Sequence, residues 1–353
     1  MWAWTCRRVW ATILSMHWDM IGHAWAVELL HKHVAQDEVR HAYLLVGPEA
    51  VGKRTLALQF VRALNCSASP SPGEFCGECR ACRLAPINQY PDLHIVETAE
   101  TERKLKVDAI RALQRQLALS PYEGRKRVAL LLRFHEATPQ AANALLKTLE
   151  EPPDDVILIL TASSIQGLLP TIISRCEVLG LRAMPRVALS QALQSRGQSA
   201  EQAELLAAIS GGRPGLAMRM THEPKLLQDR DERIDDFLEI IAGSRVDRFR
   251  HVEQWDAHLR RTTEDMDFRR DSCIDVLQTW LGLSRDLMLL STGAKAPLAN
   301  PDREEALRDL ARSIPQEALE RGLRSIVHTR DAIARNANLR LALEAMMLEL
   351  PTS

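Results

Sequence analysis

The chain has 353 residues, of which 46% are hydrophobic and 26% are charged, close to the average for globular proteins. This composition excludes collagen-like, disordered and mucin-like chains, and the length predicts two or three domains. Because 45 Lys and Arg residues offset 46 Asp and Glu residues, the net charge of −1 provides no overall attraction to nucleic acid or to a membrane. The aromatic content of only 5% favours a helix-rich chain over a β-sandwich or barrel.

The N-terminal segment, residues 1–15, is interpreted as a disordered extension, with Met16 as the more natural start. Its apolar stretch is short, is interrupted by Arg7 and Arg8 and leads to no small-residue cleavage site, so it does not fit a signal peptide. No apolar run approaches the roughly 20 residues that span a bilayer. We therefore expect a soluble, cytoplasmic protein whose seven cysteines stay reduced.

The region 16–181 alternates between short apolar runs and helical patterns. The predicted strands lie at 42–46, 94–97, 128–132 and 156–160. The predicted helices lie at 22–40, 54–65, 107–119 and 139–150. Strands that alternate with helices in this way predict an α/β domain with a parallel sheet.

Beyond Arg175 the sequence predicts no further strand. Residues 182–222, punctuated by Gly and Pro, are predicted to form a second, smaller helical domain, and 223–353 are helical throughout. Apolar side chains recur on helical faces of this last region, at Ile274, Leu277, Leu281, Met288, Leu339, Leu343, Met346 and Leu350. These stripes predict the core of a helix bundle.

Four clustered cysteines are the strongest metal signal. Cys76, Cys79 and Cys82 form two consecutive C-x-x-C steps, and Cys66 can supply a fourth ligand from the end of the preceding helix. A closed shell of four thiolates is typical of structural zinc, because it leaves no position open for water. The alternative is four unrelated reduced thiols.

The loop from Gly47 to Lys53 has the glycine and lysine spacing of a P-loop, in which backbone N–H groups and the lysine bind phosphates. A Ser or Thr that holds Mg²⁺ should follow, but the residue there is Arg54. Thr55 is one place too late, and one step along a helix turns it away by about 100°. The candidate nucleotide-binding residues are therefore those of a degenerate loop, namely Gly47, Gly52, Lys53, Arg54 and Thr55.

Carboxylates for Mg²⁺ and for the attacking water should end the strand 128–132. Leu132 and Arg133 occupy those positions, and Glu136 lies too far along to replace them. We therefore expect no ATP hydrolysis by this chain alone. Because Lys53 is retained, nucleotide binding without hydrolysis stays an open alternative.

Two longer motifs add a resemblance to a known family. The segments 138–153 (TPQAANALLKTLEEPP) and 169–176 (LPTIISRC) are similar to signatures of the bacterial clamp-loader AAA+ family. With the cysteines, the degenerate P-loop and the segment 336–344, the region 16–353 resembles the delta-prime class of that family, which serves DNA polymerase III.

The resemblance implies an AAA+ domain over 16–181, a helical lid over 182–222 and a helical collar over 223–353 that oligomerises. It implies that this chain forms a five-membered ring with gamma/tau motor subunits and delta. The chain would contact the sliding clamp and primer-template DNA through that assembly. It also implies that Arg175, with Ser174, acts in trans as an arginine finger on a neighbour's ATP. The alternative for a lone arginine is a solvated or salt-bridged surface side chain.

In motor subunits the lid helix begins with a sensor arginine. The counterpart here is Gly215, with Arg213 as a nearby alternative. Two other functions remain as alternatives: an ATP-hydrolysing motor subunit of the same family, and a zinc-dependent nucleic-acid-binding protein. The residues Leu132 and Arg133 argue against the first, and the near-neutral charge argues against the second.

Overall fold

The computed structural model describes residues 18–98 and 104–352, which divide into two compact units. The first unit contains the residues up to 185 together with 213–215, and the second contains 186–212 and the residues from 216 onward. The predicted extension over 1–15 lies outside the described residues. The division into lid and collar stays a prediction.

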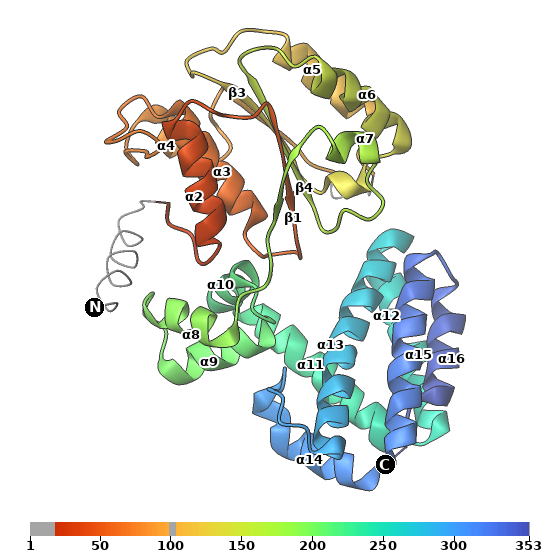
Figure 1. Ribbon diagram of the computed structural model, residues 1–353. Coiled ribbons are helices and arrows are strands. Elements are labelled where there is room, and N and C mark those ends of the chain that lie inside the picture. Colours follow the sequence, from red (N-terminus) through yellow and green to blue (C-terminus); the bar gives the residue numbers. More distant parts are fainter. Residues whose placement is uncertain (1–17, 99–103, 353) are drawn as a thin grey trace, which may run out of the picture. The chain divides into compact units, whose positions relative to one another are not determined.

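The first unit is an α/β structure in which short helices alternate with strands (Figure 1). Its helices are α2 (Ala24–Ala35), α3 (Lys53–Asn65), α4 (Arg80–Leu84), α5 (Val107–Leu117), η2 (Phe134–Glu136), α6 (Pro139–Glu150) and α7 (Pro170–Ile173). Its strands are β1 (Ala42–Val46), β2 (Leu93–Val96), β3 (Arg127–Leu131), β4 (Val156–Ala162) and β5 (Glu177–Gly180).

In the described part of the chain the strands form one parallel sheet in the order β2-β3-β4-β1-β5, which confirms the predicted sheet. Leu44 of β1 lies opposite Leu160 of β4 and Val178 of β5. Successive residues of the central strands point to opposite faces and enter two separate apolar cores. Helices α2 and α3 cover one face of the sheet, and α5 and α6 cover the other (Figure 1).

The prediction that no strand follows Arg175 is wrong, because β5 pairs with β1 at the edge of the sheet. Leu179 is the one fully buried side chain among its four residues. An edge strand with one covered face carries no continuous apolar run, so no strand is predicted there from the residue pattern.

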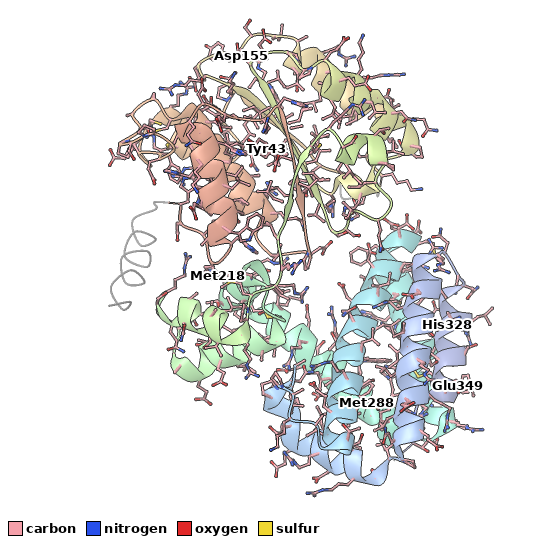
Figure 2. All side chains as sticks on the ribbon, in the orientation of Figure 1. Tyr43, Asp155, Met218, Met288, His328 and Glu349 are labelled. Carbon is pink, nitrogen blue, oxygen red and sulfur yellow. The ribbon has the colours of Figure 1, made fainter. Side chains whose placement is uncertain are left out.

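Tyr43 of β1 joins the sheet to its covering helices (Figure 2). Its hydroxyl contacts Nδ1 of His33 at 2.9 Å and accepts the N–H of Arg40 at 2.9 Å. Its ring meets the Phe60 ring edge-on, with centroids 5.0 Å apart. Burial raises the pKa of Tyr43 to about 12, so this hydroxyl stays neutral.

The second unit is helical throughout, as predicted. Its elements are α8 (Arg186–Gln194), α9 (Ala200–Ile209), α10 (Pro214–His222), α11 (Pro224–Ala242), α12 (Arg245–Thr262), α13 (Met266–Thr292), η3 (Pro301–Arg303), α14 (Glu304–Ser313), α15 (Gln316–Ala334) and α16 (Leu339–Glu349). The first two residues of α10, Pro214 and Gly215, belong to the first unit. A capping box of Ser244 and Asp247 starts α12, and Gly293 ends α13 in a left-handed conformation.

The apolar stripes predicted on α13 and α16 lie in or against one core of the second unit. Leu277, Leu343 and Met346 are buried in it, around the fully buried Trp280. Among the helices of the described residues, none combines the length and apolar character that a membrane span requires.

Candidate metal site, degenerate nucleotide loop and exposed arginine

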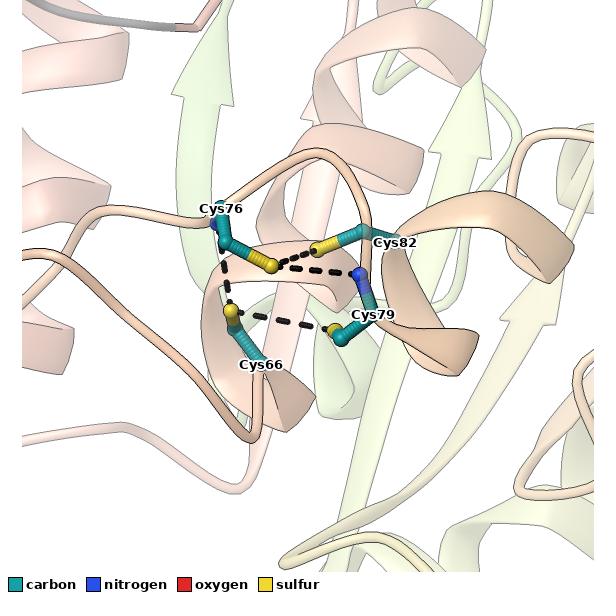
Figure 3. A group of neighbouring side chains, drawn as sticks. All are labelled: Cys66, Cys76, Cys79 and Cys82. Carbon is teal, nitrogen blue, oxygen red and sulfur yellow. Dashed lines mark hydrogen bonds between the residues drawn. The ribbon is translucent and has the colours of Figure 1, made fainter.

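The four predicted cysteines converge beside the end of α3 (Figure 3). Cys66 is the C-cap of α3, Cys79 is the N-cap of α4, and Cys82 lies on α4. All four Sγ atoms lie within 4.8 Å of one another. Backbone N–H groups also face the sulfurs: that of Cys76 donates to Sγ of Cys66, and that of Cys79 to Sγ of Cys76, both at 3.2 Å.

This donor set fits a tetrahedral metal ion. The Sγ atoms of Cys76 and Cys82 are 4.0 Å apart, and those of Cys66 and Cys79 are 3.9 Å apart. A Zn–S bond of about 2.3 Å places the corners of a tetrahedron about 3.8 Å from each other. The four cysteines could therefore hold a metal ion with little rearrangement.

The predicted degenerate P-loop joins β1 to α3, and Lys53 is the first residue of that helix. The Lys53 ammonium donates to the carbonyl oxygens of Gly47 and Pro48, the latter at 2.8 Å. Burial lowers the pKa of Lys53, although Glu49 partly offsets this effect. The lysine is thus bound to its own loop in the free chain.

Arginines occupy two positions at which the sequence pattern predicts magnesium ligands in a hydrolytic site. Arg54 forms an ion pair of 3.7 Å with Glu97, beyond the end of β2. Arg133 forms one of 3.5 Å with Glu136. Leu132 is buried, at 5% exposure. Guanidinium groups at these places repel a divalent cation and occupy the nearby carboxylates.

The start of α10 closes over the same loop. The N–H of Gly215 donates to the carbonyl of Ala50 at 2.8 Å, within the first unit. A Cβ atom at position 215 would lie 2.7 Å from that oxygen. The predicted counterpart of the sensor arginine therefore has no room for a side chain in this arrangement.

Arg175 lies between α7 and β5 and is 35% exposed. One terminal nitrogen forms a 2.8 Å ion pair with Glu150, and the other donates to the carbonyl of Thr171 at 2.9 Å. The hydroxyl of the neighbouring Ser174 also donates to Thr171 O, at 3.2 Å.

The acidic partners of these arginines were missed by sequence reasoning. Glu97 closes a predicted strand and Glu150 lies inside the motif 138–153, so both were visible as acids. Their pairing depends on how separate elements meet at the sheet edge, which a linear pattern does not specify.

Comparisons with known proteins relate the chain to subunits of DNA polymerase III. A family model described as "DNA polymerase III, delta subunit" matches residues 22–185. A second, described as "DNA polymerase III, delta subunit, C terminal", matches residues 264–352.

Three similar proteins are subunits of DNA polymerase III, two of them delta' subunits and one a tau subunit. The chain is 37% identical over 201 residues to DNA polymerase III subunit delta' of Pseudomonas aeruginosa, covering 56% of this chain and 61% of that protein. It is 26% identical over 325 residues to the delta' subunit of Bacillus subtilis, covering 92% and 94%. It is 27% identical over 320 residues to the tau subunit of Bacillus subtilis, covering 85% and 55%. Over most of its length the chain is therefore similar to the delta and delta-prime subunits of DNA polymerase III.

Proposed function

We propose that this chain is a delta-prime-type subunit of the bacterial clamp loader, which helps load the sliding clamp onto primed DNA and does not itself hydrolyse ATP. Its similarity to delta and delta-prime subunits of DNA polymerase III supports the role in the assembly. The observation that carries the absence of hydrolysis is the pair of arginines, Arg54 and Arg133, at positions where Mg²⁺ needs oxygen ligands.

The proposed partners are gamma/tau motor subunits and delta in a five-membered ring, with clamp and primer-template DNA reached through that ring.

Arg175, with Ser174 beside it, is the proposed arginine finger for the ATP of a neighbouring motor subunit. Its partial exposure to solvent supports this role. A guanidinium there would stabilise the charge that develops on the transferred phosphate.

We also propose that Cys66, Cys76, Cys79 and Cys82 hold one structural Zn²⁺. The sulfur spacing and the closed thiolate shell support zinc, whose role would be to stabilise the segment between α3 and α4.

Steady-state ATPase measurements on the isolated chain test the proposal, together with copurification with gamma and delta homologues. We expect no turnover above that of a Lys53→Ala control, and a sized complex that contains all three subunits. Turnover that disappears with Lys53→Ala would instead favour a motor subunit. Tight binding of the isolated chain to primed DNA at moderate salt would favour a nucleic-acid-binding protein.

A further inference from the structure

We propose that Glu150 is a positioning residue that orients Arg175 toward the ATP of the neighbouring subunit. The inference rests on the proposed finger role of Arg175. It concerns how the first unit prepares that side chain before the neighbour's phosphate is present.

Two acceptors on different elements fix the guanidinium. The carboxylate of Glu150, the last residue of α6, forms an ion pair of 2.8 Å with one terminal nitrogen of Arg175. The carbonyl oxygen of Thr171 on α7 accepts a hydrogen bond of 2.9 Å from the other terminal nitrogen. Because the guanidinium is planar and rigid, contacts at both of its ends define its plane as well as its position.

The position of Glu150 is itself anchored. Helix α6 begins at the Thr138 cap, whose side chain accepts the N–H of Ala141, with Pro139 in the first turn. Leu145 and Leu149 bury its inner face against the sheet. The carboxylate that orients Arg175 is therefore carried by a rigid element.

Helix stability does not explain a glutamate at this place. A carboxylate in the last turn opposes the helix dipole, which favours cations at the C-terminus. Arg175 supplies the compensating charge. Since Glu150 is 50% exposed, the ion pair also contributes little to folding. The ion pair instead orders the long side chain of Arg175.

The two contacts leave donors for an incoming phosphate. A guanidinium has five N–H groups, and Glu150 and Thr171 use two of them. In the part of the chain that the structure describes, this side chain donates to no other acceptor. Glu150 can therefore stay bound while Arg175 contacts a γ-phosphate, which makes it an orienting group and not a competitor.

The test uses the reconstituted complex with motor subunits whose own finger arginines are replaced by alanine. The remaining clamp- and DNA-stimulated ATPase then reports the site that faces Arg175. Glu150→Ala should lower kcat about two- to tenfold, the factor expected when a flexible side chain loses its preorganisation. KM for ATP should stay unchanged, because the orientation acts on the transition state.

Glu150→Gln keeps an acceptor oxygen and should retain most of the activity. Glu151→Ala is the matched control, because in the described residues this exposed neighbour forms no ion pair with Arg175. In an Arg175→Ala complex, the added Glu150→Ala change should cause no further loss. Sizing of each complex separates these effects from impaired assembly.

The possible failures are distinguishable. If Arg175→Ala leaves the ATPase unchanged, both the finger role and this inference are overturned. If Arg175→Ala lowers it but Glu150→Ala does not, only the positioning role is overturned. A faster ATPase in Glu150→Ala would also overturn it, because the carboxylate would then restrain the arginine.

Discussion

Arg248 donates a hydrogen bond of 2.8 Å to the main-chain carbonyl of Leu350 and thereby ties the first turn of α12 to the end of α16. The guanidinium is 1% exposed and donates to four further carbonyls, those of Ile240, Ile241, Met347 and Pro351. All five N–H groups are thus satisfied. The positive charge lies where the C-termini of α11 and α16 converge, which is favourable for both helix dipoles.

We predict that Arg248→Met lowers the free energy of unfolding by about 3 kcal/mol or more, because buried carbonyls lose charge-assisted hydrogen bonds. Urea denaturation measures this loss. Hydrogen exchange of the peptide 339–352 should also become faster. Arg250→Met is the control, since Arg250 is exposed and pairs with Asp247 on the same helix. Equal stability of the two variants would contradict the role of Arg248.

The buried carboxylate of Asp92 in the first unit should make the free energy of unfolding depend on pH. Asp92 is fully buried and accepts the N–H groups of Tyr122, Glu123 and Gly124 at 2.6, 2.9 and 2.7 Å. Burial alone would raise the pKa of Asp92, but these donors and Arg127 outweigh it and lower the pKa below its usual value. The stabilisation is therefore complete above a pH of about 4 and is lost as the pH falls through the folded-state pKa.

We predict that Asp92→Asn destabilises the protein at neutral pH by about 2–4 kcal/mol, and that its difference from the wild type shrinks in acid. Urea denaturation across a pH series measures this difference. Asp155, a surface residue labelled in Figure 2, is 57% exposed and pairs with Lys126. Asp155→Asn should have little effect at any pH. A constant difference between wild type and Asp92→Asn in acid would contradict the lowered pKa.

The contact between Gly215 and Ala50 predicts that a side chain at position 215 disturbs the loop. Gly215→Ala places a Cβ atom 2.7 Å from the Ala50 carbonyl and should cost about 1–3 kcal/mol of stability. Alanine is otherwise favoured over glycine in a helix, so a net loss identifies the contact. Gly180→Ala is the control, because no heavy atom lies within 4 Å of its Cβ. If thermal unfolding gives Gly215→Ala and Gly180→Ala the same midpoint temperature, the prediction is refuted.

The parts of the structure that could be predicted are those whose residues form a pattern between neighbours in the sequence. Strands β1, β3 and β4 are buried on both faces, so each is a continuous apolar run. The cysteine cluster was also visible, because three of its ligands are close in sequence. Edge strand β5 was missed for the opposite reason, since Leu179 alone is fully buried in it.

The acidic partners of Arg54 and Arg175 were not predictable in this way. The pairs Arg54–Glu97 and Arg175–Glu150 join residues that are far apart in the chain. The contact of Gly215 with Ala50 likewise needs the backbone path of two distant loops. These contacts follow from the sheet order and the packing of its connections, which are tertiary properties.

The cysteine cluster predicts about one zinc ion per chain, measurable by elemental analysis of protein prepared in metal-free buffer. Cys79→Ser should lose the metal and destabilise the segment between α3 and α4. Binding should weaken as the pH falls, because the ligands are thiolates and protons compete with the metal. Cys176→Ser, outside the cluster, should keep its zinc. A Cys79→Ser protein with unchanged metal content and stability would exclude this assignment.

Replacement of Arg175 tests the proposed contact with the neighbouring subunit. Arg175→Ala should fold and assemble, because this side chain is partly exposed and makes only surface contacts. The clamp- and DNA-stimulated ATPase of the complete complex should nevertheless fall. Arginine fingers of GTPase systems contribute about 10³–10⁵ in rate, but one site of the ring is affected here, so the total loss should be smaller.

Arg175→Lys distinguishes a finger from a general positive charge. The ammonium keeps the charge but lacks the planar fork that contacts two oxygens, so it should not restore the ATPase. It would also bind Glu150 and the Thr171 carbonyl less specifically, because its three donors rotate freely. Recovery with lysine would mean that long-range electrostatics suffice. Wild-type ATPase and loading rates with Arg175→Ala would instead assign the arginine to the surface ion pair with Glu150 alone.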